Sequence, residues 1–272
     1  MSAQPNVTAL AASDHSCQIC PVQANCLCRE LQNTELKNFE RCRGAIRVVR
    51  RGQHLFRAGD AFETIYVLRS GTVKILQGTD DNLERITGFH LPGEIIGLDG
   101  AETRRHRSTA VVLETGSVCH LPFRRVLSLC AQIPGLQVQV WRLMSQELAN
   151  KQNLLLTLGN KSAEGRLAAF LLSMAERMNG IGRSGAQFHL AMGRKEIAES
   201  LGLTLETVSR IFTRFHAAGL IQRDRRDVRL LDVPGLRARS AGTVQAAGDR
   251  PGWRDRTGER VQLMDAVAEA RS

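Results

Sequence analysis

The sequence predicts an α+β protein with a β-roll in its amino-terminal half, one long helix after it, and a winged helix-turn-helix domain near its carboxyl end. Three observations lead to this prediction. Short apolar runs separated by glycines fill residues 45–121, an apolar repeat at helical spacing runs over residues 134–158, and two short amphipathic segments flank a glycine within residues 193–214.

The β-roll is predicted from runs such as Thr64–Leu68 and Thr72–Leu76, which are short and bounded by glycines. Short strands with regular glycine turns are typical of rolls and barrels. The pairs Gly59-Asp60 and Ser70-Gly71 stand between such runs. We expect tight hairpin connections there, because glycine adopts positive φ without steric cost.

The long helix is predicted from six apolar residues, at positions 136, 140, 144, 148, 155 and 158, that recur at helical spacing. It could be a core helix of its own domain, or a two-fold coiled-coil seam between two copies of the chain. We favour the seam, because the motif downstream is typical of dimers that bind inverted repeats. The seam residues would be Val140, Met144, Leu148, Lys151 and Leu155.

Lys151 falls in the same apolar stripe. In a two-fold seam, two ammonium groups would approach one another in a partly dry interface, which would make dimerisation marginal and open to control. A lysine that extends its charge to solvent without such a role fits the pattern equally well.

The helix-turn-helix is predicted between Gly193 and Arg214. Ile197 and Leu201 give a first short helix its inward face, Gly202 allows a sharp turn, and Thr204 is a suitable N-cap for the second helix. Residues 221–231 follow as a small hairpin wing.

The second helix presents polar side chains suited to reading DNA bases, because Arg pairs with guanine, Glu accepts from the cytosine amino group and Ser bonds several base edges. The candidate base-reading residues are Glu206, Ser209 and Arg210. The candidate phosphate contacts are Thr204, Arg214 and Arg223, which would supply affinity without sequence information.

Three clustered cysteines, Cys17, Cys20 and Cys26, form C-x2-C-x5-C, and Cys119 follows about ninety residues later. Clustered thiolates can converge on one iron–sulfur cluster while a distant fourth completes the ligand set. Zinc also accepts four thiolates and is the alternative metal, and a disulfide is a third reading. Cys28 lies close enough to the trio to substitute as a ligand.

The composition indicates a polyanionic partner, since 272 residues carry a formal net charge of +10 and the pI is near 9.9. The first sixteen residues hold no Lys or Arg, and no stretch of eighteen apolar residues occurs. We therefore expect a soluble cytoplasmic protein with no membrane partner. We do not expect an enzyme, because no nucleophile elbow, P-loop or acid–base pair stands out.

The chain is expected to divide into five parts, because the composition beyond about Arg237 shifts to Arg, Gly, Ala, Asp and Ser with little periodicity. The parts are a cysteine-rich segment at 1–30, the β-roll at 31–132, the long helix at 133–160, the winged helix-turn-helix domain at 161–236, and a disordered tail at 237–272.

Several ordered strings extend these motifs. From about Cys17 to Leu231 the chain resembles the Crp/Fnr superfamily of bacterial transcription regulators, and in particular its FNR branch, the fumarate and nitrate reduction regulators. The strings, besides C-x2-C-x5-C, are ITGFHL at 86–91, LET at 113–115 with Val118-Cys119, RLMS at 142–145, RLAAF at 166–170 and LGLTLETVSR at 201–210.

The resemblance implies a cyclic-nucleotide-binding-like β-roll and an oxygen sensor in which Cys17, Cys20, Cys26 and Cys119 ligate a 4Fe-4S cluster. In anoxia the cluster would favour a homodimer that binds inverted repeats with TTGAT-type half-sites. The resemblance also implies contact with RNA polymerase, and activation or repression of promoters.

Two departures from the family pattern bear on these expectations. Lys151 stands where many members of the branch carry an acidic residue. Gly93-Glu94 and Arg107-Ser108 are similar to the phosphate cassette of cyclic-nucleotide-binding relatives, although thirteen positions separate Glu94 from Arg107, a few more than usual. A Crp-like regulator that responds to a cyclic nucleotide or another small ligand is therefore the alternative function.

Overall fold

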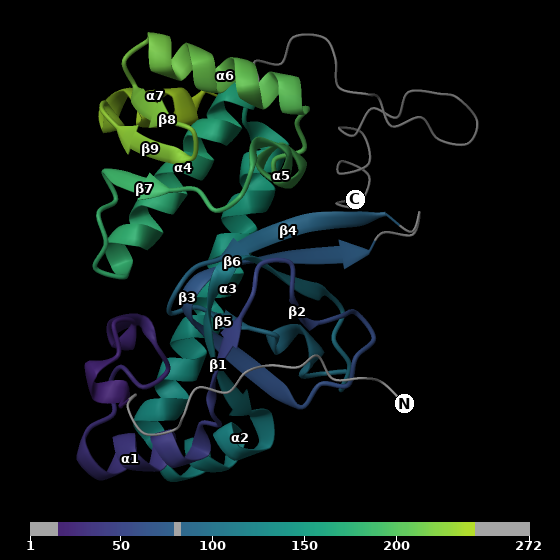
Figure 1. The fold of residues 1–272 in the computed structure, drawn as a ribbon, viewed down its shortest axis with the longest axis vertical. Helices are drawn as coiled ribbons and strands as arrows, with labels where there is room; N and C mark the ends of the chain where they lie inside the picture. Colours follow the sequence, from purple (N-terminus) through teal and green to yellow (C-terminus); the bar gives the residue numbers. More distant parts are fainter. Residues whose placement is uncertain (1–15, 79–82, 243–272) are drawn as a thin grey trace, which may run out of the picture. The chain divides into compact units, whose positions relative to one another are not determined.

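The structure, a computed structural model, describes residues 16–78 and 83–242. In chain order these residues form a cysteine-bearing segment, a β-sheet domain, a long helix, and a domain of short helices with a small sheet (Figure 1). Residues 1–15 and 243–272 lie outside the described residues, and with them most of the expected tail.

Six strands form the sheet of the amino-terminal domain, in the order β1-β6-β3-β4, with β2 paired to β6 and β5 paired to β3. Each of these pairings is antiparallel. Side chains such as Val73, Val112 and Val118 alternate with more exposed ones and pack together inside the domain. The predicted β-roll is confirmed. Its elements are β1 (Ile46–Val49), β2 (His54–Phe56), β3 (Thr64–Gly78), β4 (Glu84–His90), β5 (Ile95–Ile96), η3 (Leu98–Gly100) and β6 (Thr109–Pro122).

The hairpin expected at Ser70-Gly71 is wrong, because β3 runs straight through this pair. Its register with β6 shifts on both sides of Ser70, and Gly71 has a φ of +93°. A positive-φ glycine suits a β-bulge as well as a turn, and here it lies at a register shift within one continuous strand. Gly59-Asp60 does lie in a turn, but β2 pairs with β6 and not with β3.

Helices at one end of the sheet join it to the rest of the chain. Leu36, Phe39, Val126 and Leu136 from three of these helices are buried in a common core with strand residues. None of the helices among the described residues is long and apolar enough to cross a membrane. The elements of this region are η1 (Cys17–Ile19), η2 (Gln23–Asn25), α1 (Asn33–Cys42), α2 (Phe123–Gln132) and α3 (Pro134–Asn160).

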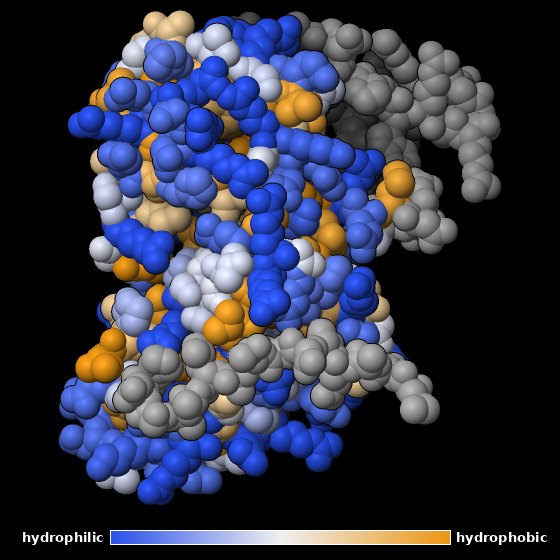
Figure 2. Space-filling model, in the orientation of Figure 1, coloured by the Kyte–Doolittle hydropathy of each residue, from blue (hydrophilic) through white to orange (hydrophobic). Residues whose placement is uncertain are grey.

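The carboxyl-terminal domain is a winged helix-turn-helix, as predicted. Leu171, Ile197, Val208 and Phe215 from three helices share one buried core, while the surface seen in Figure 2 over this domain is mostly hydrophilic. Its small sheet has the order β7-β9-β8. The elements are α4 (Ala163–Gly180), β7 (Gln187–His189), α5 (Arg194–Ser200), α6 (Leu205–Ala217), β8 (Ile221–Asp224), β9 (Asp227–Leu230) and α7 (Val233–Ala241).

Helix α7 corrects the expected domain boundary at 236 and the start of the expected tail at 237. Asp232 caps this helix by accepting a hydrogen bond from Gly235 N at 2.8 Å, and a proline stands in its first turn. Leu236 is fully buried, and Arg239 donates to Glu164 Oε2 of α4 at 2.9 Å. The helix is therefore part of the folded domain.

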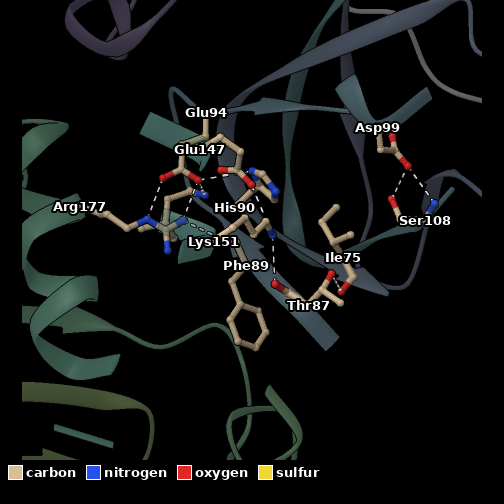
Figure 3. Close-up of polar contacts among 11 residues, drawn as sticks. Ile75, Thr87, Phe89, His90, Glu94, Asp99, Ser108, Glu147, Lys151 and Arg177 are labelled. Carbon is tan, nitrogen blue, oxygen red and sulfur yellow. Dashed lines mark hydrogen bonds and ion pairs between the residues drawn. The ribbon is translucent and has the colours of Figure 1, made fainter. Parts of the chain in front are cut away.

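An ion pair beside α3 joins the two domains (Figure 3). Arg177 of α4 donates to the two carboxylate oxygens of Glu94 at 2.8 and 2.7 Å, and to the carbonyl of Phe89 at 2.6 Å. Burial alone would raise the pKa of Glu94, but the charge and hydrogen bonds of Arg177 outweigh burial and lower this pKa. His90 Nδ1 lies 3.5 Å from Glu94 Oε2, and burial lowers the pKa of this imidazole.

Gly116→Ala should destabilise the β-domain by about 1–3 kcal/mol, because the added Cβ would clash with the carbonyl oxygen of Ser70 in the neighbouring strand. Gly135→Ala in α3 is the matched control. Its Cβ meets nothing within 4 Å, and alanine stabilises a helix by up to about 1 kcal/mol. Urea unfolding of both variants measures the difference, and a Gly116→Ala midpoint equal to the wild-type midpoint would contradict the close packing.

Glu94→Gln should remove a stabilising contribution that depends on pH. Because the pKa of Glu94 is lowered on folding, this contribution is fully present above the ordinary value of 4.5 and is lost as the pH falls through the lower folded value. The gap in unfolding free energy between wild type and variant should therefore narrow from about pH 7 to about pH 3.

Urea unfolding across this pH range measures the gap. Glu102→Gln, which changes a carboxylate that is 80% exposed, is the control and should give almost no gap at any pH. A wild-type to Glu94→Gln gap that stays constant on acidification would show that the charge of Glu94 contributes nothing to stability.

Candidate functional site

The cysteine segment is anchored to two helices. The backbone N–H of Cys17 donates to Glu40 Oε1 of α1 at 2.5 Å. The side chain of Gln139, a buried residue of α3, donates to the carbonyl oxygen of Cys26 at 3.0 Å. The segment is therefore connected to α1 through its first cysteine and to the long helix through its third.

The structure brings the amino-terminal cysteines close to Cys119. Cys17, Cys26, Cys28 and Cys119 are buried in one core cluster, and Cys20 is half-buried. Cys119 reaches this core from β6, where it lies opposite Ile46 of β1. Residues far apart in the sequence are thus buried in one core cluster.

The thiols of this cluster differ in their tendency to ionise. Hydrogen bonding with Cys28 lowers the pKa of Cys17 and of Cys26, and the same interactions raise the pKa of Cys28. Burial, with a further contribution from the nearby Cys26, raises the pKa of Cys119 to about 12. The guanidinium of Arg43 acts in the opposite direction on Cys119, and its Nη1 lies 4.0 Å from Cys119 Sγ.

Within residues 16–78 and 83–242, no group of three or more His, Cys, Asp or Glu side chains is placed to hold a metal ion. The thiols are nevertheless the donors that an iron–sulfur cluster uses, and the guanidinium of Arg43, a cation that favours thiolates, lies 4.0 Å from Cys119 Sγ. The interactions of Cys28 with Cys17 and Cys26 would have to be lost before these two sulfurs could bind a metal. The residues fit a cluster in chemistry, without a preformed ligand geometry.

The two charged residues of the possible nucleotide cassette have separate protein partners. Glu94 is bound by Arg177, whereas Arg107 Nη2 lies 2.5 Å from Glu102 Oε2. The backbone and hydroxyl of Ser108 are bound to Asp99 (Figure 3). A ribose and a cyclic phosphate would have to displace these partners, so the cassette is not poised for a nucleotide.

The second helix of the helix-turn-helix, α6, presents the predicted polar face. Gly202 in the turn before it has a φ of +62°, and Thr204 Oγ1 caps α6 by accepting a hydrogen bond from Thr207 N at 3.2 Å. Glu206 and Arg210 are exposed one turn apart, and Ser209 beside them is half-buried. The candidate base-reading side chains therefore share an accessible face.

The candidate phosphate contacts already have partners in the protein. Arg214 Nη1 forms an ion pair with Glu164 Oε1 of α4. Arg223 Nη2 lies 3.5 Å from Thr213 Oγ1. Both arginines are near α6, and a phosphate would compete with these partners for their donors.

A groove of about 470 Å³ lies between α6, the start of α5 and the wing, and four arginines contribute to its lining. They are Arg194, Arg223, Arg225 and Arg226. The guanidinium of Arg194 stacks 5.5 Å over the ring of Phe212. Sequence reasoning did not select Arg194; the only signal for it was a basic residue at the first position of the first helix.

Helix α3 carries an exposed apolar stripe. Trp141, Leu148 and Leu155 are 61%, 61% and 68% exposed, and their spacing of seven residues puts them on one face. Sequence reasoning missed Trp141, although its heptad spacing to Leu148 was a signal. Met144 is also exposed, while Val140 is half-buried and packs on the core of the β-domain.

The structure directs Lys151 toward the sheet (Figure 3). Its ammonium donates to the carbonyl oxygen of Thr87 in β4 at 3.1 Å and lies 3.4 Å from Glu147 Oε1. Of the five residues predicted for the seam, three are thus exposed apolar side chains and one is bound within its own chain.

Comparisons with known proteins match both domains. Residues 46–133 match the family described as the cyclic nucleotide-binding domain, and residues 165–239 match the Crp-like helix-turn-helix domain. Among solved structures, the chain is similar to that of FixK2 from Bradyrhizobium japonicum, with a TM-score of 0.66 and 27% identity, over 73% of this chain and 98% of that one.

Curated relatives match at higher identity. The transcriptional activator protein FnrA of Stutzerimonas stutzeri is 40% identical over 85% of this chain and 94% of its own length. The fumarate and nitrate reduction regulatory protein of Salmonella typhimurium is 39% identical over 75% of this chain and 82% of its own length. These relatives are named as regulators and not as enzymes. The chain therefore belongs to the FNR branch of the Crp/Fnr superfamily of DNA-binding transcription regulators.

Proposed function

We propose that this protein is an oxygen-responsive transcription regulator that binds promoter DNA as a homodimer when its cysteines hold a 4Fe-4S cluster. The observation that carries this proposal is the meeting of Cys17, Cys26 and Cys119 in one buried core, with Cys20 on the same short segment. Together with membership of the FNR branch, it favours a cluster over zinc, which remains the alternative metal.

Cys17, Cys20, Cys26 and Cys119 would hold the cluster. The chemistry that it would supply is reaction with dioxygen, which dismantles it. The protein's part is to link the ligand segment to the dimer helix, and the hydrogen bond from Gln139 to the Cys26 carbonyl supports this role. A movement of Cys26 would be transmitted to α3 through this hydrogen bond.

Dimerisation is proposed to occur through α3. Trp141, Leu148 and Leu155 form an exposed apolar stripe, and burying such a stripe against a two-fold copy is the usual way to remove it from water. A dimer would also present two α6 helices to the two half-sites of an inverted repeat.

The proposed DNA target is an inverted repeat with TTGAT-type half-sites, in which Glu206, Ser209 and Arg210 read bases. Thr204, Arg214 and Arg223 are proposed to contact phosphates. The regulator would act in the cytoplasm, where the promoters lie, and would activate or repress them through contact with RNA polymerase.

A response to a cyclic nucleotide is the alternative, since residues 46–133 match the cyclic nucleotide-binding family. It is less well supported, because Glu94 and Arg107 are both bound by other side chains. Calorimetry of the metal-free protein with cyclic AMP would give saturable heat if this alternative held.

Anaerobically purified protein should be brown and contain about four iron and four labile sulfide atoms per chain. Cys119→Ser should abolish the absorption, because it removes the ligand that joins the segment to the sheet. Cys130→Ser, which changes a half-buried cysteine of α2, is the matched control and should keep it. Iron analysis and absorption spectra decide the outcome, and colourless protein containing zinc would refute the cluster.

Arg210→Ala should weaken binding to the specific site by about 1–3 kcal/mol and relax the preference for guanine, since a bidentate base contact would be lost. Arg214→Ala should weaken binding to specific and random DNA alike and reduce the salt dependence, because a phosphate contact would be lost. Titrations on both DNAs at several salt concentrations test this. Equal losses for Arg210→Ala on specific and random DNA would rule out base reading by this residue.

A further inference from the structure

We propose that Asn25, together with the turn at residues 91–94 on which it packs, couples the cysteine segment directly to the DNA-binding domain, by a route that does not pass through the dimer helix. This turn follows β4 and is contacted from one side by the cysteine segment and from the other by α4. Under the function proposed above, the signal would be a change in the cluster that the cysteines hold. The coupling itself depends only on contacts within the chain.

The contact from the cysteine segment is made by Asn25, the residue before Cys26. Its side-chain amide donates to the carbonyl oxygen of Gly180, the last residue of α4. Its Cβ also lies 3.0 Å from the position that a Cβ on Gly93 would occupy, and Gly93 has a φ of +92°. Asn25 therefore packs on the turn and bonds the DNA-binding domain at the same time, which requires glycine at position 93.

The contact from α4 is made by Arg177. Its guanidinium binds both carboxylate oxygens of Glu94 and the carbonyl of Phe89, just before the turn (Figure 3). Arg177 and Gly180 are three residues apart and so lie on the same side of α4. Both contacts to α4 are thus made at one place, its carboxyl-terminal turn.

A displacement of α4 would move the DNA-reading helix with it. Leu167, Leu171 and Met174 of α4 share a buried core with Ile211 and Phe215 of α6. Close-packed cores transmit displacement because they hold few voids to absorb it. Asn25 is thus connected to α6 through a rigid helix.

The residue after Asn25, Cys26, is also connected to α3, because the side chain of Gln139 donates a hydrogen bond to the Cys26 carbonyl. A change at Cys26 would act on two outputs: the pairing of the chains through α3, and the position of α6 through Asn25. Replacing Asn25 should therefore separate the two outputs.

The experiment is hydrogen–deuterium exchange of the metal-free, full-length chain with Asn25→Ala. Three amides report on the end of α4, because Ile181 and Arg183 donate to Met178 O and Gly182 donates to Asn179 O. Loss of one hydrogen bond should speed their exchange by about 2- to 10-fold. Gln18→Ala, an exposed residue of the same segment, is the matched control and should leave them unchanged.

A second comparison uses the chain purified anaerobically with its iron. In the wild type, exchange at residues 181–183 should differ between the iron-loaded and metal-free chains. In Asn25→Ala this difference should disappear, while sedimentation still shows dimerisation that follows the iron content.

Wild-type exchange at residues 181–183 in metal-free Asn25→Ala would overturn the coupling, and so would an iron-dependent difference that survives this substitution. If anaerobic preparations contain no iron, the function proposed above fails instead. The metal-free comparison still decides whether Asn25 couples the two regions.

Discussion

The arrangement of this protein depends on an ion pair that crosses between its two domains beside apolar contacts. Phe89 and Leu91 of the β-domain pack against apolar residues of the carboxyl-terminal domain. Such contacts bury apolar area but do not fix one orientation of the two domains. The pair of Glu94 and Arg177 does fix one, because a guanidinium binds a carboxylate through two parallel hydrogen bonds in a single orientation. Removing either partner would leave the other charge in a largely buried place.

Most of the architecture could be predicted from local patterns. The turn glycine at 202, the N-cap Thr204 and the apolar side chains of α6 act within a few residues of each other, so the sequence contains their geometry. Ser70-Gly71 shows the limit of such reasoning, because positive φ permits a bulge or a turn and only the partner strand selects between them. The last helix, α7, was missed for a related reason, since Leu236 indicates a helix only when the core that buries it is known.

The site was only partly predictable. Cysteine spacing selected Cys17, Cys20 and Cys26 as candidate ligands, whereas the interaction of Cys28 with Cys17 and Cys26 depends on a fold that spacing does not encode. The pair of Glu94 and Arg177 joins positions 83 residues apart, beyond the reach of any periodicity. On α3, the apolar repeat predicted the helix but not which of its faces is exposed, because that depends on where the β-domain packs.

Glu164 of α4 has two cationic neighbours, Arg214 from α6 and Arg239 from α7. If Arg214 turns outward to a phosphate, Arg239 stays behind to neutralise the carboxylate. Arg214 can therefore change partners without leaving the negative charge of Glu164 unpaired next to a polyanion. A chain truncated after residue 236 would lack Arg239, and with it this second counter-ion, while keeping every residue of α6.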